Sequence, residues 1–213
     1  MINPANHIST PKALRTRQKM FDATEQILSR EGYAAWNEEY LCSLCDCTRG
    51  AFRYQFPAGR YDLFPAFVES VINQDTRMVD SLGELAPTAR MYLFLISMRT
   101  RPPSPATRAM LELSMAARGD AELFVRIDPI MDSANARILG IGPDEINPEI
   151  AALRCILHGV SMYSFQKDYS PQGLDNMLGW ILDYLPVPAE IAARGAEMVH
   201  ARRFAGTTES LPK

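Results

Sequence analysis

The stretch from Asn37 to Phe56 constrains the fold of this chain more than any other. Its sequence, NEEYLCSLCDCTRGAFRYQF, predicts two short helices joined by a tight turn. Asn37 is a favourable N-cap, because its side chain can accept a hydrogen bond from a backbone N–H of the first turn. Asp46 tolerates left-handed backbone angles and marks the turn. Thr48 can then cap the second helix, so the chain doubles back within twenty residues.

The second helix of this hairpin has two different faces. Its apolar residues Ala51 and Phe52 can pack against the first helix. The outward face is polar and consists of Arg49, Gly50, Arg53, Tyr54 and Gln55. This is how a helix-turn-helix presents a recognition helix to the major groove of DNA. Any capped helical hairpin looks similar, however, and these twenty residues alone favour ordinary helix packing over DNA binding.

The flanking residues add a family resemblance. Residues 18–33 form one apolar helical stripe that Gly32 can end in a left-handed cap. The run MFDATEQILSREGYAAWNEEYLCSLCDCTRGAFRYQFPAGRYDLF, within the first third of the chain, resembles the N-terminal domain of TetR-family transcriptional regulators. The resemblance implies an all-α fold with a three-helix helix-turn-helix DNA-binding domain at 12–75. It also implies a larger helical effector-binding and dimerisation domain at 76–205.

Two positions of the second helix depart from the family pattern. Arg53 stands where the family most often has tyrosine, and Tyr54 stands at the usual histidine. Both side chains can still reach a phosphate, Arg53 as a charged fork and Tyr54 through its hydroxyl. The departures therefore affect the base contacts rather than the fold. The candidate DNA-binding residues are Arg15, Arg17, Asn37, Thr48, Arg49, Gly50, Ala51, Arg53, Tyr54 and Arg60.

Charge is distributed unevenly along the chain. The net charge of −3 hides eight Lys or Arg against six acids in residues 1–60, and fourteen against nineteen in the remainder. Lys12, Arg15, Arg17 and Lys19 all precede the first acid, Asp22. A basic arm of this kind can contact phosphates. The alternative is a solvated helix N-terminus that happens to be basic.

Three of the four cysteines, Cys42, Cys45 and Cys47, lie close together in the hairpin. Structural zinc needs four Cys or His ligands, and none of the three histidines is near them in sequence, so we predict no metal and no cofactor. Free cysteine behaves as a small buried hydrophobe, which favours core packing, with redox sensing as the alternative. The sequence also lacks the motifs of nucleophilic, metal-dependent and phosphoryl-transfer catalysis, so we expect no enzyme.

The rest of the chain is helical by pattern. A helix at 61–79 contains Pro65, which is tolerated only near the helix start. Further helices are predicted at 84–100, 105–118, 121–139, 148–167, 172–185 and 188–204, with a disordered tail after Gly206. No apolar run approaches the ~20 residues of a membrane span. Residues 1–11 contain no apolar signal core either, so we predict a cytoplasmic protein without membrane contact.

The segments 148–167 and 172–185 are apolar on nearly all sides. Such helices must be buried on both sides, either within a monomeric bundle or against a twin subunit, and the family resemblance favours a homodimer. Methionine and aromatic residues are frequent beyond Asp75 and suit either a core or an effector pocket. We therefore predict a regulator, a repressor released by a small hydrophobic effector, on an inverted-repeat operator in double-stranded DNA. The alternatives are a helical dimerisation module without DNA binding and an all-helical enzyme.

Overall fold

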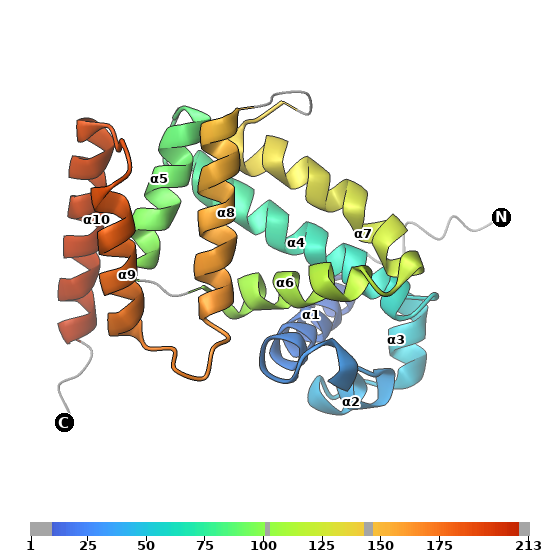
Figure 1. Cartoon of the computed structure of the whole chain (residues 1–213). Helices are drawn as coiled ribbons and strands as arrows, with labels where there is room; N and C mark the ends of the chain where they lie inside the picture. The colour runs from blue at the N-terminus through green and yellow to red at the C-terminus, as the bar shows by residue number, and fades with distance from the viewer. Residues whose placement is uncertain (1–9, 101–102, 143–146, 209–213) are drawn as a thin grey trace. The chain divides into compact units, whose positions relative to one another are not determined.

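The computed structural model describes residues 10–100, 103–142 and 147–208. Over these residues the chain folds into α-helices with no strand, which confirms the predicted all-α class (Figure 1). A 3₁₀ turn at Tyr33–Ala35 follows the first helix and a π turn at Asn135–Leu139 follows the seventh. The ten α-helices are α1 (Pro11–Glu31), α2 (Glu38–Leu44), α3 (Arg49–Gln55), α4 (Arg60–Asp80), α5 (Pro87–Met98), α6 (Pro105–Ala117), α7 (Ala121–Ala134), α8 (Pro148–Tyr163), α9 (Pro171–Asp183) and α10 (Ala189–Thr208).

Proline and short polar side chains set several of the helix starts. Five helices, α1, α5, α6, α8 and α9, begin with proline, whose fixed φ suits the first helical position and whose missing N–H has no partner there. Thr10, Asn147 and Ser170 cap α1, α8 and α9 through side-chain oxygens. The cap at Thr10 explains why α1 begins at Pro11 rather than at the predicted Gln18. The basic residues at 12–19 are therefore part of a helix and not of an extended arm.

Most predicted segments agree with the observed helices within a few residues, and the differences lie at the ends. The predicted helix at 121–139 stops being α-helical after Ala134 and continues as the π turn. The tail predicted to be disordered after Gly206 is helical through Thr208, since α10 includes these residues. Residues 209–213, and residues 1–9 of the signal-sequence prediction, lie outside the described part of the chain.

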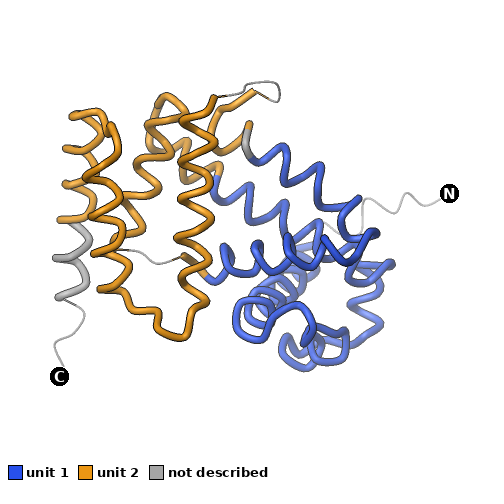
Figure 2. The backbone as a smooth tube through the Cα atoms, viewed as in Figure 1, with its two compact units in different colours: residues 1–75, 105–134 blue, residues 76–104, 135–213 orange. Residues whose placement is uncertain are grey.

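The helices group into two compact units (Figure 2). Unit 1 comprises residues 1–75 and 105–134, and unit 2 comprises 76–104 and 135–213. The first boundary coincides with Asp75, where the predicted DNA-binding domain ends. The helices α6 and α7, however, belong to unit 1, where α6 packs against α1 and α7 packs against α6. The functional division into 12–75 and 76–205 stays a prediction.

Unit 1 is held together by aromatic rings between α1, the hairpin and α4. Phe21 lies 6.2 Å from Phe56 and 6.1 Å from Phe67, measured between ring centroids. Trp36 lies 4.9 Å from Phe64 in an edge-to-face arrangement. Such pairs add about 0.5–1.5 kcal/mol beyond the area they bury. The α6–α7 hairpin adds Leu113 and Ile127, among other residues, to the buried residues of this unit.

Unit 2 has its core around α5, which contacts α8, α9 and α10. The side chains Met91, Tyr92 and Leu95 of α5 are at most 1% exposed. Tyr92 donates its hydroxyl hydrogen to Glu149 Oε1 over 2.8 Å, and burial together with this carboxylate raises the pKa of Tyr92 to about 12. A Cβ at Gly195 would lie 2.7 Å from Ile96, so glycine is what allows α10 to approach α5 so closely.

Candidate DNA-binding surface

The helical hairpin has the geometry predicted from its sequence. Asn37 accepts a hydrogen bond from Tyr40 N at 2.9 Å and caps α2, and Thr48 accepts one from Ala51 N at 3.1 Å and caps α3. Asp46 has a φ of 51°, in the left-handed region where Asp is tolerated better than most residues. The short turn therefore places α3 directly after α2, as in a helix-turn-helix.

The inner side of α3 fixes the helix in unit 1. Phe52 is fully buried, with its ring 6.3 Å from Trp36 and 5.7 Å from Phe56. Gln55, predicted to be outward, instead lies half-buried and donates from Nε2 to the Ala13 carbonyl over 3.3 Å. A polar residue in a short helix cannot be assigned to one face by spacing alone, because the face depends on where α1 lies. The hydrogen bond ties α3 to α1.

The outer side of α3 presents polar groups to solvent. The side chains of Arg49 and Arg53 are 69% and 50% exposed, and Tyr54 is 62% exposed. Thr48 and Gly50 are exposed as well, while Ala51 is half-buried. A Cβ at Gly50 would meet only the Thr48 hydroxyl, at 3.8 Å, so the backbone there can approach another molecule closely.

Two of the candidate DNA-binding residues, Arg17 and Arg60, which we expect to contact phosphates rather than bases, lie against aromatic rings. The Arg17 guanidinium is 4.8 Å from the Phe56 ring centroid and 5.2 Å from that of Phe21, and burial lowers its pKa from the ordinary value. The Arg60 guanidinium lies 5.4 Å from Trp36 and 5.6 Å from Tyr33. A ring over a guanidinium leaves edge N–H groups for a phosphate, although Arg60 Nη1 already donates to the Tyr33 hydroxyl over 3.4 Å. Their phosphate role stays a prediction, beside a packing role that the sequence did not suggest.

The other basic residues near the start of α1, Lys12, Arg15 and Lys19, have exposed side chains. They belong to the first three turns of the helix that Gln55 ties to α3. Exposed cations beside the hairpin are suited to a phosphate backbone. Of the predicted residues, Asn37 and Thr48 thus have a structural role as helix caps, and Arg15, Arg49, Gly50, Arg53 and Tyr54 are exposed.

The cysteines of the hairpin pack in and beside its turn. Cys42 and Cys45 are buried, and Cys45 Sγ lies 3.1 Å from Cys47 Sγ, with all three present as free thiols. Burial raises the pKa of Cys42 and of Cys47 above the ordinary thiol value, so both are neutral at neutral pH. The thiolate is the reactive form, which favours packing over redox sensing. Among the described residues no group of three His, Cys, Asp or Glu could hold a metal ion.

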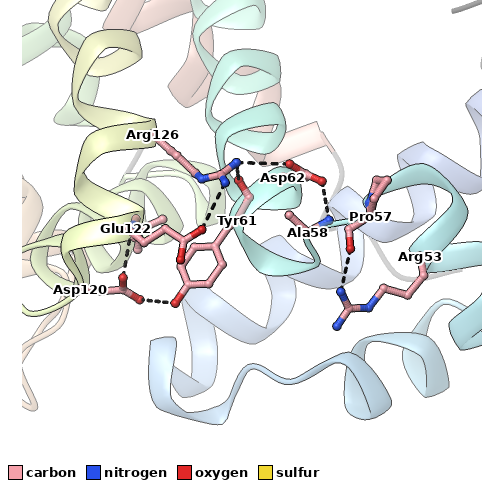
Figure 3. A network of polar contacts seen from close by, with 9 residues as sticks. Arg53, Pro57, Ala58, Tyr61, Asp62, Asp120, Glu122 and Arg126 are labelled. Carbon is pink, nitrogen blue, oxygen red and sulfur yellow. Dashed lines mark hydrogen bonds and ion pairs between the residues drawn. The ribbon is translucent and has the colours of Figure 1, made fainter. Parts of the chain in front are cut away.

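Polar contacts that the sequence did not reveal join α7 to the start of α4 (Figure 3). Pro65 has no N–H, which leaves the carbonyl of Tyr61 without its helical partner, and Arg126 Nη1 donates to that carbonyl over 3.2 Å. Asp120 accepts hydrogen bonds from the hydroxyls of Tyr33 and Tyr61, at 2.9 and 3.2 Å. These contacts attach α7 to the helix that follows the hairpin.

Unit 2 carries an exposed apolar surface on α8 and α9. Trp180 and Tyr184 are 65% and 74% exposed, and their ring centroids lie 4.8 Å apart. Beyond the first turn of α8, from Ala151 onward, the exposed residues repeat every three or four positions and are small or apolar except for one histidine: Ala151, Ala152, Cys155, His158, Gly159 and Met162. These two helices are the ones predicted to be apolar on nearly all sides. No helix in the described part of the chain is both long and apolar enough to cross a membrane.

Unit 2 also contains a hollow of about 400 Å³ between α5, α9 and α10. Its size is within the range of small-molecule sites. Of the methionine and aromatic residues that suit either a core or a pocket, Met91, Tyr92 and Met98 belong to the packed core. The lining is mostly apolar with a few charged groups: Ile96, Arg99, Leu182, Asp183, Val187, Ala192, Ala196, Val199 and His200.

Comparison with known proteins agrees with the fold and goes no further. No protein-family model matches the sequence, and no curated protein matches it either. Among solved structures, the chain is similar to a protein from Rhodococcus sp. assigned to the TetR family of transcriptional regulators. The TM-score is 0.56 at 18% identity, over 79% of this chain and 97% of that one. It is also similar to GusR of Salmonella enterica, with a TM-score of 0.55 at 15% identity, over 92% and 98%. The chain therefore has the TetR-family regulator fold that its sequence predicted.

Proposed function

We propose that this protein is a transcriptional regulator that binds double-stranded DNA through α3. The observation that carries the proposal is the capped hairpin, which buries Phe52 and leaves Arg49, Gly50 and Tyr54 exposed on the other side. Guanidinium and phenol groups bind phosphates and base edges, and a glycine allows close backbone approach. The fold shared with a regulator of the TetR family supports the proposal.

A gel shift and a footprint on the DNA that flanks the gene test this proposal. A two-fold dimer with one recognition helix per subunit should protect an inverted repeat, with half-sites about one helical turn apart or somewhat more. The dissociation constant for the specific site should be well below ~10⁻⁶ M at physiological salt. Binding weaker than that and without sequence preference would favour a helical dimerisation module that does not bind DNA. Protection of one unpaired half-site would contradict a two-fold dimer.

The homodimer in this proposal is assigned to α8 and α9. Their exposed apolar residues, among them Met162, Trp180 and Tyr184, form the kind of surface that soluble proteins use for association. The small residues Ala151, Ala152 and Gly159 would let a second helix approach α8 closely. Sedimentation of the protein without DNA should show a dimer. A monomer at micromolar concentration would contradict this assignment.

The regulator is proposed to act as a repressor that a small, mostly apolar molecule releases from DNA. A ligand shifts an equilibrium only if it binds the two states with different affinities. Effector and operator must therefore weaken each other's binding by the same factor, and the corresponding coupling free energy is typically ~1–3 kcal/mol. Calorimetric titration of an active compound with and without operator DNA measures how much the operator weakens ligand binding. Titration of the operator with and without the compound measures the reciprocal effect. Equal ligand affinity in the two titrations would mean that the compound does not regulate DNA binding.

The hollow in unit 2 is the proposed effector site, and its mostly apolar lining suits a hydrophobic compound. The excess of acids in residues 61–213 favours a neutral or cationic compound over an anion. Replacing Ala196, which lines the hollow, with Trp should fill it and abolish ligand binding. Ala193→Trp, on an exposed part of the same helix outside the lining, is the matched control. If the Ala196→Trp protein binds the compound as the wild type does, the effector site lies elsewhere.

A further inference from the structure

One arginine of the recognition helix is engaged within the protein. Arg53 Nε donates to Glu38 Oε2 over 3.0 Å, and Nη2 donates to Glu38 Oε1 over 2.5 Å. Its third nitrogen, Nη1, donates to the carbonyl of Pro57 over 2.8 Å (Figure 3 shows this last contact). A two-pronged contact between guanidinium and carboxylate is the strongest ion-pair geometry that side chains make. Arg53 thereby connects the start of α2, the end of α3 and the α3–α4 loop.

The loop is shaped to cover this ion pair. Gly59 has a φ of 65°, which side-chain-bearing residues rarely adopt. A Cβ at Gly59 would lie 2.7 Å from Glu38 Oε1 and 3.3 Å from Arg53 Cζ. Glycine at this position therefore serves two needs, the backbone angle and the space for the pair. The Glu38 side chain is only 15% exposed, so its carboxylate has lost most of its contact with water.

A contact to a DNA base that turned the Arg53 guanidinium away from Glu38 would break these three hydrogen bonds, which use three of its five N–H donors. It would leave the Glu38 carboxylate largely desolvated, with Arg49 Nη2 at 4.0 Å as its nearest ion-pair partner. A partly buried charge that loses its partner is strongly unfavourable. The carboxylate would then also face the negative charge of DNA. Arg49 differs from Arg53, because its side chain is 69% exposed and its ion-pair contact within the described part of the chain is this distant one.

We propose that Glu38 and Arg53 are a positioning pair that fixes α3 relative to α2 and the α3–α4 loop, so that Arg49 and Tyr54 are left to contact the bases. This inference rests on the proposed function for its DNA part, because without a specific operator there are no bases to read. Its structural part, one coupled unit of Glu38, Arg53 and the loop, is independent of DNA.

Binding-site selection with Glu38→Ala and Arg53→Ala tests the pair directly. If it positions α3, both variants should lose operator affinity on the order of tenfold, and the preference should weaken at all positions of the motif together. The double variant should bind the operator with the same affinity as either single variant, within about twofold. Each single substitution already breaks the ion pair, so the second substitution has nothing further to remove. A base contact predicts otherwise: Arg53→Ala changes one base position, and Glu38→Ala leaves the motif unchanged or strengthens it. That result would overturn the proposal.

Two conservative variants keep the test valid if the alanine variants fold poorly. Glu38→Gln keeps an oxygen acceptor without the charge, and Arg53→Lys keeps the charge without the two-pronged geometry. A positioning pair predicts that both weaken the preference over the whole motif. Normal DNA binding by the Arg53→Lys protein would mean that only the positive charge at this position matters, as it would for a contact with a DNA phosphate. That result would also overturn the proposal. Arg49→Ala is the matched control and should alter one base position only.

Thermal unfolding separates a failure of this inference from a failure of the proposed function. If the wild type selects no DNA motif, the proposed function fails, while the coupling of Glu38 and Arg53 can still be measured. The two alanine variants and the double variant should then have the same melting temperature, below that of the wild type. Additive losses in the double variant would show that the residues act separately, and the pair would be refuted.

Discussion

The outward faces of α3 and α9 are both exposed, and their chemistry is opposite. On α3 the exposed side chains are Arg49, Arg53 and Tyr54, two of them charged. On α9 and its C-cap they include Trp180 and Tyr184, whose rings are tilted against each other with their centroids 4.8 Å apart. The charged face gains nothing from losing water unless an anion replaces it. Removing the aromatic face from water is favourable in itself. The first face therefore suits DNA and the second suits another protein surface.

This difference should be visible in how salt affects the two associations. Binding to DNA releases counterions, so its affinity falls steeply as salt concentration rises. Association through an apolar face changes little with salt. Two surfaces of one chain can thus be tested separately in the same buffer series, and each of the following predictions is designed to break or sharpen the contrast.

The largest effect is expected at the apolar face. Trp180→Asp would place an unpaired charge in the proposed dimer interface, at a cost of several kcal/mol, and should raise the dimer dissociation constant by about a hundredfold or more. Analytical ultracentrifugation measures the constant. Ala193→Asp adds the same charge at an exposed position of α10 and should leave the dimer unchanged. A folded Trp180→Asp dimer of normal affinity would place the interface elsewhere.

The next effect is expected at the charged face. Arg49→Ala should relax preference at one base position by about 1–3 kcal/mol, because it removes a possible two-pronged contact to guanine. Binding-site selection with the variant and the wild type measures this change. Arg30→Ala removes an equal charge from an exposed position at the end of α1 and is the control. An unchanged motif in the Arg49→Ala protein would mean that Arg49 contacts phosphates only.

The helix content and the hairpin could be predicted from the sequence because they depend on local signals. The caps Asn37 and Thr48, the turn at Asp46 and the stop at Gly32 each act within a few residues, and all four are confirmed. The long-range likeness to TetR-family regulators followed from the same segment and is confirmed at the level of the fold.

The partners of individual side chains could not be predicted in this way. Arg17 and Arg60 were assigned to phosphates by charge, yet their guanidinium groups lie over rings that are distant in sequence, such as Phe56 and Tyr33. Spacing indicates which residues lie on the same side of a helix but not what packs against that side. The Pro65 irregularity carried a signal that could have been used, because the carbonyl it leaves at Tyr61 requires an outside donor, which is Arg126.

A smaller effect separates positioning from phosphate contact in α1. Lys19→Ala should lower the slope of log affinity against log salt by about one, without changing stability, because the side chain is exposed. Arg17→Ala should lower the slope and also the melting temperature, since it removes contacts with two rings. Gel shifts over a salt series and thermal unfolding provide both measurements. An unchanged slope for both variants would remove α1 from the DNA-binding surface.

The smallest effect concerns Asp120, which joins α7 to the rest of unit 1. Its carboxylate accepts hydrogen bonds from Leu123 N and from the hydroxyls of Tyr33 and Tyr61. These hydrogen bonds, the one from Leu123 N most of all, lower the pKa of Asp120 from the ordinary value. Because the folded pKa is lowered, the stabilisation is present above the unfolded value of about 3.9 and is lost as pH falls through the folded pKa.

Asp120→Asn should therefore reduce the free energy of unfolding near neutral pH, by less than about 1 kcal/mol for a group this accessible. The difference from the wild type should shrink as the pH falls below about 4. Urea titrations between pH 3 and 7 measure it, with Asp128→Asn, exposed on the same helix, as the control. A difference that is the same at every pH would mean that the asparagine disturbs packing and that the charge of Asp120 has no part in holding α7. The polar contacts of unit 1 would then be consequences of its fold, while the apolar contacts between its helices set its stability.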